Sequence, residues 1–299
     1  DAAMQANTTG AYNVAVGRLA LGANTTAASN TAVGYAALTA NTTGANNTAV
    51  GKNAMAATTT GYNNVAIGEA SLDLNTTGLW NVAVGVGALT AATTANSNTA
   101  IGTSSLANAT TGAQNTAVGH QAGYTNTTGA SNVAMGFESL RLNTTGANNT
   151  ALGYRALLAC TTGASNVAVG YAALDTLTTG TENVGIGKNA LDRLTTAGAN
   201  TALGAEALNR NVTGDGCTGI GFQALEVVTG GTNTALGYKA GETLTSGSNN
   251  TLLGNEAAPS AVDVSNEFTL GNGSVSALRC NDTSIAALSD RRDKKDIID

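Results

Sequence analysis

The stretch Asn46–Met55 reads NNTAVGKNAM, and close copies of it recur along the chain. SNTAVGYAAL occupies Ser29–Leu38, and NNTALGYRAL occupies Asn148–Leu157. The glycine that closes each AVG-like triplet returns every 17 residues, with one step of 16 between Gly221 and Gly237. So strict a period indicates a repeat architecture in which each copy stacks on the next. The 16 glycines are Gly17, Gly34, Gly51, Gly68, Gly85, Gly102, Gly119, Gly136, Gly153, Gly170, Gly187, Gly204, Gly221, Gly237, Gly254 and Gly271.

Positions within each copy are numbered here from this glycine, which is position 0. Position −1 is always aliphatic or Met, and position +3 is always Ala or Ser, whereas position +1 varies widely, as in Arg18, Tyr35 and His120. Position −4 is Asn in 14 of the 16 copies, with Cys217 and Glu267 as the exceptions. We expect the invariant positions to face the same environment in every copy, and the variable ones to face water or a partner.

The length of the repeat selects the backbone. A helical repeat needs two helices and about 33 residues or more, and neither a heptad nor an 11-residue pattern divides 17. N-T-A-V-G alternates with the period-2 pattern of a strand. N-T-T-G is typical of a turn, because Asn and Thr side chains form hydrogen bonds with nearby backbone groups and Gly readily adopts a positive φ. The sequence therefore predicts an all-β fold, a β-solenoid or β-roll of 17-residue rungs.

When identical rungs stack, each residue lies directly above the residue at the same position of the rung below. The small residue at position +3 predicts a narrow interior. The recurrent Asn has two interpretations: a structural ladder, in which each amide bonds the Asn above and below, or a turn former. With strands about 4.8 Å apart, 16 rungs would make a rod on the order of 75 Å long. The residues of the candidate ladder are Asn13, Asn30, Asn47, Asn64, Asn81, Asn98, Asn115, Asn132, Asn149, Asn166, Asn183, Asn200, Asn233 and Asn250.

The composition predicts a thin core. Aromatic residues make up 4% of the chain, with 38 Gly and a single Pro, Pro259. A thin rod of this kind gains stability by association, so we expect a fibrous homotrimer. The apolar V-G and A-L positions would then be divided between the core of one chain and a seam between chains, and the sequence does not assign which is which.

Charge excludes several partners. The net charge is −6 with 11% charged residues, so there is no basic stripe for phosphates and no nucleic-acid binding is expected. No apolar run reaches the roughly 18 residues of a membrane span, so no membrane insertion is expected. The chain starts inside a repeat, with the turn Asn7–Gly10 already in register, and not with a signal peptide. We therefore expect further protein before Asp1.

No constellation of catalytic, metal or cofactor residues stands out, and no enzyme activity is expected. Cys160, Cys217 and Cys280 are an odd number and widely spaced, and we interpret Cys160 and Cys217 as small rung residues. His120 is the sole histidine and falls at a variable position, so neither a zinc site nor a catalytic triad can be built on it. The N-T-T triplets satisfy the N-glycosylation rule, although their regular placement favours a structural turn.

The period stops after Gly271, which divides the chain into a shaft (1–271), a cap or tip segment (272–288) and a terminal segment (289–299). Leu288–Ile297 reads LSDRRDKKDI and resembles the start of the endosialidase-type (S74) intramolecular chaperone domain. The body of such a domain is absent from the sequence. The 17-residue array upstream is similar to the Asn-Thr-Ala-Val-Gly repeats of phage tail fibre proteins, and more weakly to the β-roll heads of trimeric autotransporter adhesins.

These resemblances imply a function. The chain would be the shaft and tip of a trimeric viral tail fibre, an extracellular part of the virion that attaches to the host cell surface. Its partners would be two further copies, a host surface glycan or other receptor met around Glu256–Arg279, and other tail or baseplate proteins. The chaperone family commonly cleaves itself at a junction that corresponds here to Ser289 and Asp290. The alternative is a bacterial trimeric adhesin or filament on the cell surface, and a polysaccharide depolymerase or an ice-binding protein is less favoured.

Overall fold

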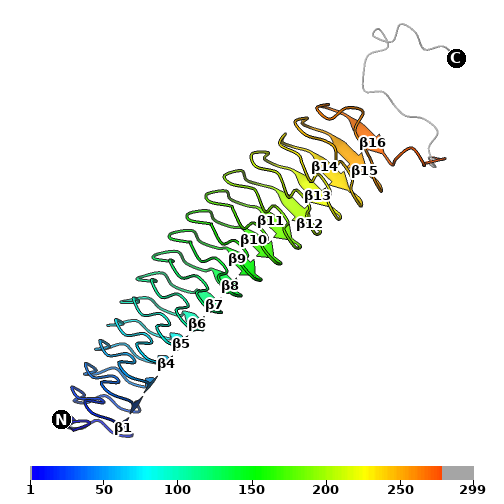
Figure 1. Cartoon of the computed structure of the whole chain (residues 1–299). Helices are drawn as coiled ribbons and strands as arrows, with labels where there is room; N and C mark the ends of the chain where they lie inside the picture. Colours follow the sequence, from blue (N-terminus) through cyan, green and yellow to red (C-terminus); the bar gives the residue numbers. More distant parts are fainter. Residues whose placement is uncertain (1, 278–299) are drawn as a thin grey trace, which may run out of the picture.

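The computed structural model describes residues 2–277, and these form an all-β solenoid drawn out into a rod (Figure 1). Sixteen strands of three residues each form a single parallel sheet in which sequence order is spatial order. The predicted fold class is therefore confirmed. The strands are β1 (Val14–Val16), β2 (Thr31–Val33), β3 (Thr48–Val50), β4 (Val65–Ile67), β5 (Val82–Val84), β6 (Thr99–Ile101), β7 (Thr116–Val118), β8 (Val133–Met135), β9 (Thr150–Leu152), β10 (Val167–Val169), β11 (Val184–Ile186), β12 (Thr201–Leu203), β13 (Thr218–Ile220), β14 (Thr234–Leu236), β15 (Thr251–Leu253) and β16 (Phe268–Leu270).

Register between neighbouring strands follows the sequence period. Each strand residue pairs with its counterpart 17 residues on, as Ala32 does with Ala49. The short copy does not break this pattern, because Thr218 pairs with Thr234 and Gly219 with Ala235. The missing residue is therefore absorbed in the turn region between β13 and β14, and the sheet runs through it without a slip.

The position-0 glycine ends each strand at a corner that other residues cannot form. Gly119 has a φ of 136°, a conformation that L side chains rarely adopt. A Cβ added there would lie 2.4 Å from the carbonyl oxygen of Gly136 in the next rung. Backbone conformation and the close approach of the next rung together explain why this position is glycine in every copy.

The interior is a single narrow core that runs the length of the rod. It is filled by position −2 of the strand and by the A-L pair at +3 and +4, and Ala32, Ala37 and Leu38 are all fully buried. Position −1 of the strand points the other way and stays partly or largely exposed. Within each chain, the A-L positions therefore form the core, and the V-G aliphatic residue does not.

Most rungs hold three non-glycine residues in the left-handed region, which costs on the order of 1–3 kcal/mol each. In the second rung these are Ala36 (φ 55°), Leu38 (φ 51°) and Asn46 (φ 59°). Backbone hydrogen bonds to adjacent rungs offset this strain: the Ala36 amide donates to the Arg18 carbonyl at 2.9 Å, and the Leu38 amide to the Ala54 carbonyl at 3.0 Å. A rung is thus stable only within a stack.

Beyond β16 the described chain, up to residue 277, contains no further strand. The residues predicted for self-cleavage, Ser289 and Asp290, lie outside the described residues, as does Cys280. The strands β1 to β16 lie between Val14 and Leu270, within the predicted shaft at 1–271.

Candidate functional site

The structure places the recurrent Asn at position −4 in a hydrogen-bonded column inside the rod. In β3's rung the backbone amide of Asn47 donates to Oδ1 of Asn30 at 2.9 Å, and Nδ2 of Asn47 donates to the Gly61 carbonyl at 2.8 Å. Each amide thus joins its own rung to the next. The same pattern includes Asn13 at the first rung and Asn250 near the last. All fourteen residues of the candidate ladder take part, so the position serves the stability of the rod.

This first ladder is interrupted once. Cys217 donates its backbone amide to Asn200 Oδ1 at 2.9 Å, but its thiol offers Asn233 no amide oxygen. The thiol lies 3.3 Å from the Gly230 carbonyl, and burial raises its pKa. Burial likewise raises the pKa of Cys160 to about 11. Both thiols are free and enclosed, as expected for small interior residues.

A second ladder was not recognised from the sequence. The Asn of N-T-T lies at position +7 and is buried: Asn41 Nδ2 donates to Asn24 Oδ1 at 3.1 Å and to the Gly44 carbonyl at 2.9 Å. The turn signal masked this role, although recurrence of the same residue at a fixed position could have revealed it. Enclosure of the amide also keeps these N-T-T acceptors from a glycosylating enzyme in the folded chain. The buried members are Asn24, Asn41, Asn75, Asn126, Asn143 and Asn211.

The outer side of the sheet repeats the same residue types along the rod. We define the strand face as positions −3 and −1 of all sixteen strands, whose side chains are more exposed than the buried position −2 between them. Position −3 carries Thr or Val and, once, Phe268; position −1 carries only Val, Ile, Leu or Met. Position −3 is partly exposed from β2 to β15, and position −1 ranges from partly exposed, as at Val33, to largely exposed, as at Leu152 (43%) and Leu236 (50%). No charged residue occurs at any of these positions.

A ladder of aromatic rings follows position +1, one residue past the glycine corner. His120, Phe137, Tyr154 and Tyr171 stack in succession, with ring centroids 5.3, 5.4 and 5.1 Å apart. Each such pair contributes about 0.5–1.5 kcal/mol beyond its buried area. The sole histidine is therefore one member of a surface stack.

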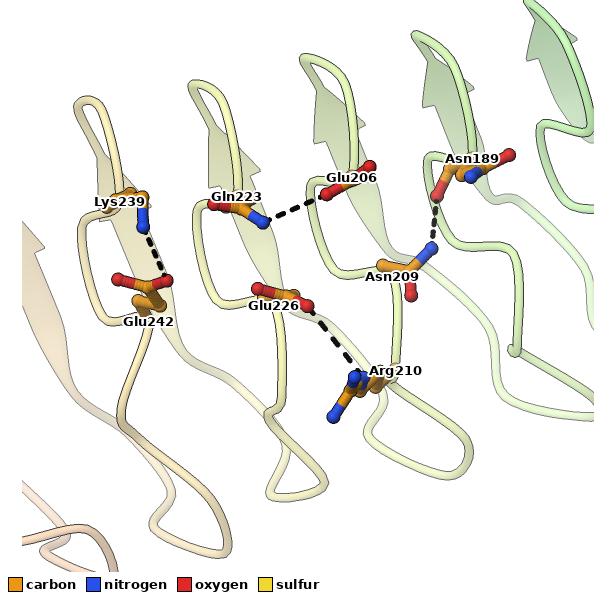
Figure 2. Close-up of polar contacts among 8 residues, drawn as sticks. All are labelled: Asn189, Glu206, Asn209, Arg210, Gln223, Glu226, Lys239 and Glu242. Atoms are coloured by element: carbon orange, nitrogen blue, oxygen red, sulfur yellow. Dashed lines mark hydrogen bonds and ion pairs between the residues drawn. The ribbon is translucent and has the colours of Figure 1, made fainter.

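A charged surface follows positions +2, +5 and +6 in the C-terminal half of the rod, and we call it the polar strip. Figure 2 shows its last rungs: Gln223 donates to Glu206 at 2.9 Å, Arg210 lies 3.7 Å from Glu226, and Lys239 contacts Glu242 at 2.9 Å. The charged residues of the strip are Glu138, Arg141, Arg155, Asp175, Asp192, Arg193, Glu206, Arg210, Glu226, Lys239, Glu242 and Glu256. Before Glu138, Asp73 is the one charged residue at these positions within the described chain.

The polar strip differs in character along its length. In its middle, burial raises the pKa of Asp175, and the Arg155 guanidinium, 3.3 Å away, partly offsets this rise. Burial also raises the pKa of Asp192. At its C-terminal end a cavity of about 220 Å³ opens to the surface. Its lining residues are Lys239, Glu242, Thr243, Glu256 and Ala258. Of these, Glu256 and Ala258 belong to the segment Glu256–Arg279, for which the sequence predicts a receptor site.

Across residues 2–277 no group of three or more His, Cys, Asp or Glu side chains is arranged to hold a metal ion. In the same residues no helix has the length and apolar character to cross a bilayer. No protein-family model matches the chain, and no curated protein matches it either. The resemblance to tail fibres therefore rests on the repeat and on the C-terminal residues quoted above.

Proposed function

We propose that the chain forms the shaft and tip of a trimeric viral tail fibre that attaches the virion to the host cell surface. The observation that carries the proposal is the sixteen-rung sheet, which stays in register across a one-residue deletion. A single long, regular rod is both extended and stiff, as a fibre shaft must be.

Stiffness follows from the way in which rungs are joined. Neighbouring rungs share backbone bonds in the sheet and at the N-T-T turn, where the Thr42 amide donates to the Thr59 carbonyl at 3.0 Å. Asn47 and Thr42 add side-chain bonds to the same neighbour. Bending the rod would break bonds on several sides of a rung at once, so the two ends stay about 75 Å apart.

Attachment would use the C-terminal end, where the polar strip offers a cavity. Lys239 donates hydrogen bonds, and Glu242 and Glu256 accept them, as sugar hydroxyls require. Tyr238 next to Lys239 is 48% exposed and gives an aromatic surface beside these polar groups. A neutral surface glycan fits this combination.

The proposal is tested by binding of the fluorescently labelled chain to host bacteria. The double variant Glu242→Gln/Glu256→Gln keeps the shape of the cavity and removes its two anionic acceptors. We expect at least a tenfold loss of cell binding, whereas Glu69→Gln/Glu182→Gln, at exposed positions of other rungs, leaves binding unchanged. Equal binding by both variants would place the receptor site elsewhere.

A chain that binds no cell surface would argue against attachment altogether. A secretion or anchoring signal in the complete gene product would favour the bacterial adhesin instead. Shortening of host polysaccharide during incubation with the chain would point to a depolymerase.

A further inference from the structure

We infer that the strand face is the seam along which copies of this chain pack side by side. The inference deepens the proposed fibre, on which it rests for the number of chains. It commits to one occupant, a second copy of the same rod. Three features of the strand face support it: its composition, its area and its periodicity.

Composition sets the strand face apart from the rest of the surface. An exposed sheet face in a soluble protein normally carries polar side chains, and charged ones guard it against association. Here every charged residue that the structure describes lies at another position. Lys52 and Glu69, for example, stand at position +1, only two residues from Val50 and Ile67. Charge is thus tolerated beside the strand face and absent from it.

The area suffices for a stable interface. Position −1 is 41% exposed at Ile67, 45% at Leu203 and 50% at Leu236. Summed over sixteen rungs, this column alone offers on the order of 1,000 Å² of apolar surface, against the roughly 800 Å² per partner of a standard two-chain interface. A trimer divides this column between two neighbours, and the partly exposed Thr and Val side chains of position −3 add to it. Monomeric soluble proteins rarely expose contiguous apolar patches larger than a few hundred Å².

Periodicity favours a copy of the same chain over an unrelated protein. Rungs on two parallel rods share one spacing, so a contact made by one rung is repeated by all the others. The aromatic stack from His120 to Tyr171 lies one residue past the corner from Val118, Met135, Leu152 and Val169. The stack repeats with the same period as the strand face and adds exposed aromatic surface in the middle of the rod. A membrane is disfavoured as the occupant, because the strand face has no Lys or Arg to bind anionic lipid headgroups.

The test is the particle mass of the full chain by light scattering. For the unchanged protein we expect about three times 29.3 kDa. Met135→Lys/Leu152→Lys places two charges in the centre of the strand face and should reduce the mass threefold, to that of one chain. The matched control is Thr128→Lys/Thr145→Lys, which places the same charges at exposed turn positions and should leave the mass unchanged.

Crosslinking keeps the inference testable if the charged variant fails to fold. In a chain carrying Cys280→Ser, the substitution Leu152→Cys should give rapid disulfide-linked dimers, because equivalent strand-face residues meet at the seam. Thr145→Cys in the same background should not. A monomeric unchanged protein, a trimer that survives the Lys substitutions, or equal crosslinking at both positions would each overturn the assignment. Host-cell binding is measured in a separate experiment, so the strand face can be confirmed as the seam between chains even if the attachment proposal is wrong.

Discussion

At the scale of single residues, two asparagine columns fix one rung onto the next. A buried amide is stabilising only if its donors and acceptor are bonded. In the first ladder this condition is met by the backbone of neighbouring residues. Nδ2 of Asn47 donates to the Gly61 carbonyl, and Oδ1 of Asn47 accepts a hydrogen bond from the Asn64 backbone amide. In the second ladder it fails at three positions where the next rung lacks an Asn: Oδ1 of Asn41, Asn75 and Asn143 has no hydrogen-bond partner within the described chain.

The break in the first ladder can be repaired. Cys217→Asn would give the Asn233 amide an Oδ1 acceptor and would offer Nδ2 to the Gly230 carbonyl, which the thiol now approaches. We expect the free energy of unfolding to rise by about 1 kcal/mol for each hydrogen bond gained. Urea titration measures this change. Cys217→Ala is the control, because it removes the thiol without supplying a hydrogen-bonding amide. No gain over the alanine variant would mean that the ladder contributes little to stability.

The second ladder offers an independent case. Thr58 separates Asn41 from Asn75 and accepts one long hydrogen bond, 3.4 Å, from Asn75 Nδ2. Thr58→Asn would supply a donor to the unpaired Asn41 Oδ1 and a better acceptor to Asn75. Stabilisation of about 1 kcal/mol is expected in the same titration, because a buried unpaired acceptor is satisfied. Thr60→Asn, at an exposed position in the same turn, should change stability by less than about 0.5 kcal/mol.

At the scale of the rung, the glycine corner and the N-T-T turn have unequal tolerance for change. The corner is fixed both by backbone conformation and by contact with the next rung. The turn lies on the outside, where Thr26, Thr43 and Thr60 are exposed. This difference leads to one prediction for each element.

For the corner, Gly119→Ala forces a Cβ to 2.4 Å from the Gly136 carbonyl oxygen at a φ of 136°. We expect the loss of at least about 2 kcal/mol of stability, since strain and clash add. The control is Gly22→Ala at position +5, where φ is not positive and the nearest contact is 3.2 Å. Thermal unfolding of both variants decides, and equal midpoints would contradict the role given to the corner.

For the turn, the natural 16-residue copy shows that one residue can be spared. Deleting Thr162 from another turn should cost about 1 kcal/mol, the value of the lost amide bond to Thr178. Deleting Ala168 from β10 should cost more than about 4 kcal/mol, because a one-residue slip turns Val169 into the narrow core. Both chains have the same length, so circular dichroism during urea unfolding compares the positions directly.

The fold was largely predictable from the sequence because the period constrains register, corner and core together. The glycine at position 0, the narrow interior at position +3 and the short strand follow from single positions. The division of apolar residues did not follow, because Val33 and Leu38 are equally apolar and only the three-dimensional path shows that Leu38 is enclosed. The second ladder was missed since Asn24 in N-T-T satisfies a turn signal equally well. The cavity at Lys239 and Glu256 joins two rungs through long side chains, which spacing alone does not place.

At the scale of the whole molecule, the rod is uniform inside and differentiated outside. Its core repeats Ala or Ser at position +3 and, in most rungs, Leu at position +4. The strand face is uncharged along its full length, while the polar strip is charged only in the C-terminal half. A rod that is apolar on one side and charged near one end can associate laterally and still present a distinct surface to a ligand at that end.

The most direct test of this account is the mass per unit length of the native particle, measured by small-angle X-ray scattering in solution. Rods packed side by side through the strand face predict a shaft about 75 Å long with three times the mass per unit length of one chain. A particle with the mass per unit length of a single chain, whether 75 Å long or extended end to end, would contradict it.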